Sequence, residues 1–230
     1  SKVTDMYFMF EYVGYQANTV NINVSGIDTS KVVDFGGMFS ETGYGSANWN
    51  VVGYGGFDTS SAQFMNNMFA YAGRADTTVT MENISGWKTD NVINMSYMFN
   101  ETAFNSSSFV VNLSSWNTEN VKNMYYMFFK TGNQAGTFSL GNIGGWKTGN
   151  VTTMGFMFTG AGQSSTSWYI GDVSNWNLSN VSNFKALFNA PGTNAVNWSV
   201  GDLSNWDVSN GVNFEAMFLA QNKPDSLNVP

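Results

Sequence analysis

The 230-residue chain contains no cysteine and no histidine. The missing cysteines exclude disulfide bonds and zinc–thiolate sites, and the missing histidines exclude Ser-His-Asp triads and histidine metal sites. Charged residues make up only 11% of the chain, against roughly 25% in ordinary soluble domains. The 16 carboxylates are spread along the sequence, so a catalytic carboxylate pair would need chance proximity. We therefore expect a protein that is not an enzyme and that needs no cofactor.

Positive charge and long apolar runs are also scarce. The nine basic residues are scattered singly in a chain of net charge −7, whereas a nucleic-acid surface needs clustered Lys and Arg. No stretch approaches the roughly 18 apolar residues of a membrane span. We expect neither a nucleic-acid partner nor a segment that crosses a membrane.

Neutral polar residues and a repeat are what the chain has in abundance. It contains 31 Asn, and such an amide-rich surface favours an extracellular location. A Met-Phe or Leu-Phe pair recurs at steps of 29 or 30 residues, which defines eight repeats. The first residues of these pairs are Met9, Met38, Met68, Met98, Met127, Met157, Leu187 and Met217.

A large apolar residue stands 11 positions before each pair from the second repeat onward. The distance between this apolar residue and the pair never varies, so we interpret the segment that joins them as one rigid unit. All variation in repeat length falls between the pair of one repeat and the large apolar residue of the next. These apolar residues are Ile27, Phe57, Trp87, Trp116, Trp146, Trp176 and Trp206.

The rigid unit predicts a short helix of about two turns. In the fourth repeat Val92, Met95, Met98 and Phe99 fall within an arc of about 120° when plotted at 100° per residue, as on one buried helical face. An Asn precedes this segment where a helix N-cap belongs. The equivalent residues are Asn91, Asn120, Asn150, Asn180 and Asn210.

The other half of the repeat predicts a strand. Apolar residues alternate in the shorter copies, as at Val20, Ile22 and Val24, which is typical of a half-buried strand. The longer copies slip by one residue near a glycine, and we interpret this slip as a β-bulge. The glycines are Gly141, Gly171 and Gly201.

One strand and one short helix cannot bury their own apolar faces, so neighbouring repeats must stack. The predicted fold class is an α/β repeat solenoid with a parallel sheet on one face and short helices on the other. We expect residues 1–230 to form a single solenoid domain, open at both ends, as a fragment or a stacking unit.

The unit Trp-x-Thr-x-Asn-Val-x-Asn-Met-x-x-Met-Phe, seen at 87–99 and 116–128, resembles a bacterial surface-protein repeat of the BspA-like leucine-rich-repeat group. The resemblance covers nearly the whole chain. It implies a leucine-rich-repeat-like solenoid, display on a cell surface or secretion, adhesion to host or matrix, and no catalytic residues. This chain departs from the family by a longer segment between Met-Phe and the next Trp, which leaves the ligand open.

A polar column provides the candidate binding face. It lies four residues before each large apolar residue, and in a stacked sheet its members would point outward and bond amide to amide. The adjacent carboxylates Asp172 and Asp202 repel one another, which suggests a weak cation site, for Ca²⁺ for example, or a contact for a basic ligand. The candidate residues are Asn23, Asn83, Asn112, Asn142, Asp172 and Asp202.

Two further columns have simpler interpretations. The Trp column suggests sugar stacking, but Ile27 and Phe57 take the same place, which favours core packing. The Thr column at Thr29, Thr59, Thr89, Thr118 and Thr148 resembles ice-binding repeats, but it is one residue wide, which favours turn capping.

Three functions remain open. The first is a surface adhesion module that binds an extracellular protein or glycan through the polar face or the variable loops 44–48, 132–136 and 162–167. The second is a structural subunit that stacks with copies of itself into a filament. The third is a viral or phage attachment appendage.

Overall fold

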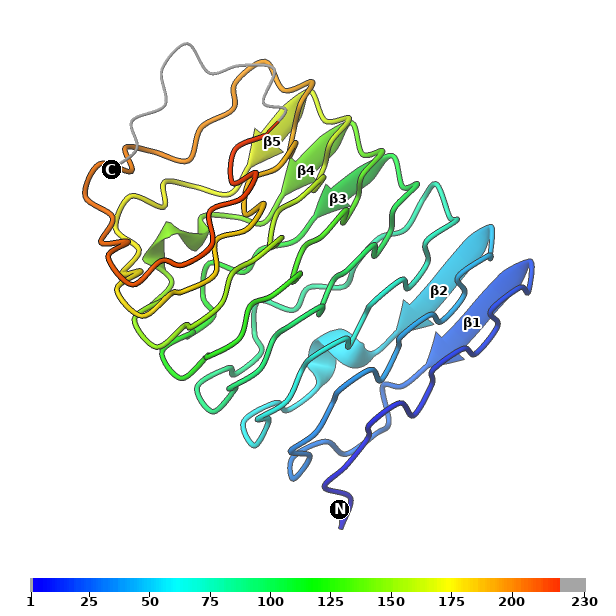
Figure 1. Cartoon of the computed structure of the whole chain (residues 1–230). Coiled ribbons are helices and arrows are strands. Elements are labelled where there is room, and N and C mark those ends of the chain that lie inside the picture. The colour runs from blue at the N-terminus through cyan, green and yellow to red at the C-terminus, as the bar shows by residue number, and fades with distance from the viewer. Residues whose placement is uncertain (1, 220–230) are drawn as a thin grey trace.

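Parallel strands from successive repeats form two small sheets in the computed structural model, which describes residues 2–219 (Figure 1). Strand β1 (Thr19–Asn23) pairs with β2 (Asn48–Val52), and β3 (Ser108–Val110), β4 (Thr137–Ser139) and β5 (Ser167–Tyr169) pair in that order. Partners such as Phe109 and Phe138 come from adjacent repeats. Each repeat is therefore one coil, and we number the coils 1 to 8 by their Met-Phe or Leu-Phe pairs.

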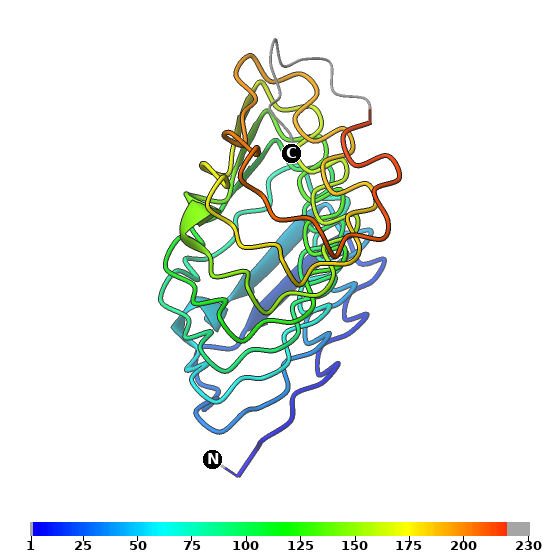
Figure 2. The ribbon, with the colours of Figure 1, turned by 60° about the vertical axis from the view of Figure 1, so that its left-hand side comes forward.

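A second parallel ladder runs along the opposite side of the coils. Single bridges join Asp5 to Asp34, Asp34 to Phe64 and so on to Asn213, always between equivalent residues of neighbouring coils. Figure 2 shows the coils lying one behind another in chain order. The predicted repeat is thus confirmed as a protein of stacked parallel coils, each held to its neighbours on two sides.

The predicted helices are wrong. The described residues contain no α-helix, and their only helical turns are the short 3-10 segments Tyr54–Gly56 and Ile143–Gly145. Around each Met-Phe pair the backbone instead forms a wound series of tight turns, which we name the turn ribbon (residues 35–46 in coil 2 and 95–106 in coil 4, for example).

Alternate amides of the turn ribbon donate in different directions. In coil 2 the N–H of Met38 donates to the carbonyl of Phe35 within the same coil (3.1 Å), whereas the N–H of Phe39 donates to Met68 in coil 3 (2.8 Å). An α-helix would direct all of these amides inward along its own axis. The ribbon therefore exchanges half of its local hydrogen bonds for bonds that join coils.

The helical pattern failed because a helix and the turn ribbon bury the same residues. Val92, Met95, Met98 and Phe99 are all fully buried, as the helical face required. The backbone turns back at left-handed positions instead, with φ of 58° at Tyr97 and 50° at Glu101. Only glycine adopts such angles without cost, so a sequence with Tyr and Glu there gives no local sign of these turns.

Aromatic columns fill the interior. The Phe of each Met-Phe or Leu-Phe pair stacks on its neighbours with ring centroids 5.3–5.7 Å apart, from Phe10 to Phe218. The Trp column from Trp87 to Trp206 is buried and stacks at 6.2–6.5 Å. Each of these indoles also donates to a backbone carbonyl 32 or 33 residues earlier, as Trp146 does to Leu113 (3.0 Å). Core packing is confirmed as the role of the Trp column.

The Thr column is buried and joins coils. The Thr118 hydroxyl, for example, donates to the carbonyl of Lys147 in the next coil (3.1 Å). A buried hydroxyl presents nothing to ice, and its bond joins two coils rather than capping a turn of its own coil. The glycines at the predicted bulge have left-handed φ angles of 73° (Gly141), 88° (Gly171) and 91° (Gly201), but Gly141 and Gly171 lie beyond the paired residues of β4 and β5, so the bulge stays a prediction.

The sheet is interrupted at coil 3. No strand lies between β2 and β3 in the described chain, and two carboxylates take its place. Asp76, only 2% exposed, accepts the N–H of Trp49 (2.7 Å), and Glu82 accepts those of Gly53 (2.7 Å) and Gly55 (2.6 Å). Coil 3 therefore meets β2 through side chains rather than through a backbone ladder.

Candidate functional site

The six residues of the predicted binding face are exposed, but they do not form an amide ladder. Each uses its side-chain oxygen locally, accepting the N–H two residues ahead, as Asn112 does from Ser114 (3.1 Å) and Asp172 from Ser174 (2.9 Å). The equivalent acceptors are Asn23, Asn83, Asn142 and Asp202. The predicted amide-to-amide contacts are therefore wrong, and the column is a row of Asx turns.

Glycine prevents the ladder from forming. A Cβ at Gly171 would clash with the amide oxygen of Asn142, and one at Gly201 would clash with the carboxylate of Asp172. Asn112, Asn142 and Asp172 thus each cover a glycine of the next coil instead of meeting the next Asn or Asp. A shallow hollow of about 280 Å³ beside the gap in the sheet includes Asn83 and Asn112.

The Asp172 and Asp202 pair remains a prediction. Asp202 accepts the N–H of Ser204 (3.0 Å), as Asp172 does with Ser174. Across residues 2–219, no group of three or more Asp, Glu, His or Cys side chains is placed to hold a metal ion. Nor does that part of the chain contain a helix long and apolar enough to cross a membrane.

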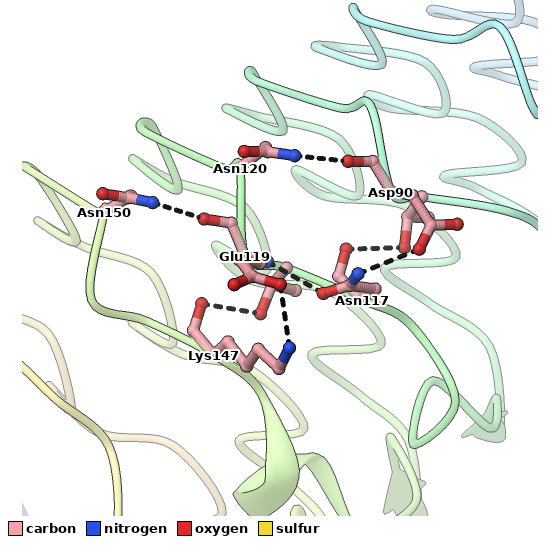
Figure 3. A network of polar contacts seen from close by, with 8 residues as sticks. Asp90, Asn117, Glu119, Asn120, Lys147 and Asn150 are labelled. Carbon is pink, nitrogen blue, oxygen red and sulfur yellow. Dashed lines mark hydrogen bonds and ion pairs between the residues drawn. The ribbon is translucent and has the colours of Figure 1, made fainter.

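A polar corner lies where the predicted N-caps stand (Figure 3). Asn120 and Asn150 cap no helix, and instead donate to the carbonyls of Asp90 (2.6 Å) and Glu119 (2.7 Å) in the preceding coil. Asn91, Asn180 and Asn210 do the same. The column therefore clamps each coil to the one before it.

Side chains of the same corner add exposed contacts between coils. Asn117 donates to the carboxylate of Asp90 (2.9 Å), and Lys147 pairs with Glu119 (2.8 Å) (Figure 3). A shallow depression of about 640 Å³ lies beside them, lined by Asn150, Asn177 and other residues. Because this ion pair is more than half exposed, it contributes little to stability.

The turn ribbon has a surface that sequence reasoning missed. Five half-buried rings meet on its outer side in coils 4 to 6, and we name them the aromatic cluster: Tyr97, Tyr125, Tyr126, Phe129 and Phe156. The Tyr126 ring stacks on Tyr97 at 5.0 Å and packs at a tilt against Phe156 at 4.6 Å, measured between ring centroids. The rings form one continuous patch across three coils.

The cluster combines apolar area with hydroxyl groups and cations. Burial, followed by the neighbouring Tyr125, raises the pKa of Tyr126 to about 12, so its hydroxyl keeps its proton at neutral pH and can donate. The ammonium of Lys130 lies 5.1 Å from the ring centre of Phe129, and that of Lys185 lies 5.7 Å from Phe156. Such aromatic and cationic combinations are enriched at binding hot spots.

A second aromatic row continues the ribbon surface through coils 1 to 4. Tyr15 stacks on Tyr44 at 4.9 Å, and the guanidinium of Arg74 lies between the rings of Tyr44 (5.3 Å) and Phe104 (4.5 Å). Glu101 fixes the Nε of Arg74 at 2.7 Å. Arg74 is the single arginine of the chain, and the aromatic row holds it in place.

The aromatic cluster uses a left-handed backbone position that recurs in every coil. Tyr97, Tyr126 and Phe156, each directly before a Met-Phe pair, have φ near +58°, a region that costs a bulky residue energy. Gly37 holds the same position in coil 2, so glycine fits this position too. The sequence signal for this cluster is a large aromatic residue directly before the Met-Phe pair in three successive repeats. The repeat pattern alone was explained by burial of the Met-Phe pair.

Comparison with known proteins places the chain in a family. The family model described as "Mycoplasma protein of unknown function, DUF285" matches residues 1–80, 74–168 and 132–227, which together cover nearly the whole chain. The tandem matches agree with the repeat and support a bacterial surface-protein repeat family. No curated protein and no solved structure shows significant similarity to the chain.

Proposed function

Because the chain belongs to this Mycoplasma family of repeat proteins, we propose that it is a non-enzymatic binding module of the cell surface, a solenoid related to the BspA-like leucine-rich repeats. Its role in this proposal is adhesion to an extracellular protein or glycan. The turn ribbon is the binding surface, and the coils are the scaffold that keeps it rigid.

The aromatic cluster is the observation that carries the proposal. Coil 2 has Gly37 and coils 7 and 8 have Ala186 and Ala216 at this left-handed position, so stacking alone does not require a large ring there. Coils 4 to 6 instead place Tyr97, Tyr126 and Phe156 there, half-exposed and strained. Tyr provides large, rigid contact area at low entropic cost, which suits a binding surface.

Binding of the purified chain to host cells, matrix proteins and a glycan array tests this function. The variant Tyr126→Asn/Phe156→Asn should lower the affinity for whichever ligand binds by roughly tenfold or more. Asn is compatible with the backbone, because Asn67 occupies the same position with φ 56°. The matched control is Tyr169→Asn in β5, which removes a ring exposed to 51% on the sheet.

A result in which both variants bind equally well would place the binding surface elsewhere. Equal melting temperatures of the variants would show that the loss of binding does not come from unfolding. If the wild-type chain binds no cell, matrix protein or glycan, the adhesion function is wrong.

A further inference from the structure

Charge is distributed unevenly along the turn ribbon. The net charge of −7 lies entirely within residues 1–120, since four lysines balance four carboxylates over residues 121–219. On the ribbon itself, Arg74 and Lys185 are each paired with a glutamate at 2.7 Å, Glu101 and Glu215 respectively. The remaining charges are Glu11 and Glu41 in coils 1 and 2 and Lys130 beside the aromatic cluster in coil 5, so one half of this surface is acidic and the other carries a cation.

The acidic half is repulsive in the single chain. Burial, and then the charge of Glu41, raise the pKa of Glu11 above its ordinary value. The pKa of the exposed Tyr12 is also raised, first by Glu41 and then by Glu11. These shifts have the direction expected where negative charge is insufficiently compensated, so a cation brought to this surface would be attracted.

Glu41 and Lys130 hold equivalent positions. Each is the second residue after the Phe of its Met-Phe pair, each is half-buried, and each has a left-handed φ, 54° for Glu41 and 50° for Lys130. Their side chains therefore leave the backbone of the ribbon in the same direction, Glu41 in coil 2 and Lys130 in coil 5. A twofold axis that crosses the ribbon between coils 3 and 4 relates coil 2 of one copy to coil 5 of another.

That axis would bring two complementary pairs of residues together. It places Glu41 of each copy opposite Lys130 of the other, so one ion pair forms twice, as an isologous interface requires. It also relates coil 1 to coil 6, which brings Phe8 toward Phe156, both of which directly precede a Met-Phe pair. Phe8 is 36% exposed in the single chain, so this contact would bury apolar area.

We propose that the turn ribbon binds the turn ribbon of a second copy of this chain, antiparallel and face to face, with Glu41 paired to Lys130 of the partner. The inference rests on the proposed function, because it uses the same surface, and it names the partner as the chain itself. On a cell surface, such pairing would join neighbouring molecules or neighbouring cells.

Sedimentation of the full chain across a concentration series, with charge-reversal variants, tests this pairing. Glu41→Lys and Lys130→Glu should each weaken dimerisation by roughly tenfold or more, because each creates two like-charge contacts. An equimolar mixture of the two variants should dimerise as the wild type does, since every contact is then between opposite charges. The column tolerates both residue types, as Glu101 and Lys130 already occupy it with left-handed φ.

The control is Lys88→Glu, which changes net charge by the same amount at an exposed position outside the ribbon, and it should leave dimerisation unchanged. A wild-type chain that stays monomeric at every concentration, or a mixture no better than its components, would overturn the proposal. A monomeric chain that still binds a host ligand through the aromatic cluster would refute self-pairing alone and leave the proposed function standing.

Discussion

Asparagine and aspartate side chains provide much of the polar bonding at the scale of single residues. In each typical coil one such residue caps a turn on the sheet side, as Asn112 does. Another caps a turn at the polar corner, as Asn117 does for Glu119 (3.1 Å), and a third caps the ribbon, as Asn123 does for Tyr125 (2.9 Å). A separate Asn clamps neighbouring coils. Neutral amides thus satisfy backbone groups that would otherwise lack partners, which explains a chain rich in Asn and poor in charge.

Asp34 is a position where an Asn would serve better. Its carboxylate accepts the N–H of Gly36 (2.7 Å), but burial and the charge of Asp5 raise its pKa. A carboxyl group with a raised pKa binds its proton more tightly in the folded state, so the wild type gains stability from this group as pH falls through that pKa. Asp34→Asn should therefore raise the melting temperature at pH 7, by about 2 °C, and the gain should vanish near pH 3.

Asp58 provides the control of opposite sign. Its pKa is lowered by the hydroxyl and the N–H of Ser60, so its ionised form stabilises the fold above the ordinary Asp pKa and loses that contribution as pH falls. Asp58→Asn should lower the melting temperature at pH 7 and have no effect in acid. If Asp34→Asn shifts the melting temperature equally at pH 7 and pH 3, charge is not the cause.

At the scale of elements, the gap in the sheet predicts a local difference in hydrogen exchange. No described acceptor receives the N–H groups of Val79, Thr80 or Met81, whereas equivalent residues of β4 and β5 lie in a paired ladder. Those three amides should exchange by direct local access, at least about tenfold faster than the amide of Ser139 in β4. Exchange resolved to single residues by NMR measures this directly. Equal protection would mean that the ladder continues through coil 3.

The elements also show what the sequence could and could not predict. Alternation at Val20, Ile22 and Val24 located β1, and the slip at Gly141 located a real change in backbone angle. The fixed distance between Trp and Met-Phe correctly placed both in the core. The helix was wrong because burial alone cannot distinguish it from a turn ribbon whose amides alternate between coils.

The candidate site was harder to predict than the fold. The polar column was found, but its amide ladder was wrong, because the glycine of the next coil occupies the place where the neighbouring amide would lie. The aromatic cluster was missed, because its members come from three coils, and the left-handed turns at Tyr97, Tyr126 and Phe156 direct them outward. The pattern of apolar and polar residues within one repeat does not show that rings from three coils meet.

At the scale of the whole molecule, the contacts that hold the stack together join adjacent coils. The Phe and Trp columns, the Thr and indole bonds and the Asn clamps all connect residues 27 to 33 positions apart. Stability should therefore be a sum of coil and interface contributions, as in other repeat proteins. Apart from coil 3, where side chains replace the backbone ladder, the coils in the middle of the stack should contribute similarly to their neighbours.

Excision of one whole coil tests this additivity. Deletion of residues 141–170 removes 30 residues and joins Leu140 to Gly171, which reproduces the natural Leu140–Gly141 junction. The rings of Phe128 and Phe188 would then lie in adjacent coils, at equivalent positions, and could stack as those of Phe128 and Phe158 do now. The shortened chain should fold with the same far-ultraviolet circular dichroism per residue, and its free energy of unfolding should fall by about the contribution of one coil and one interface.

Deletion of residues 141–155, half a coil, should instead prevent cooperative folding, because it places the polar edge of one coil against the aromatic core of the next. If the two deletions behave alike, the coils are not the units of stability.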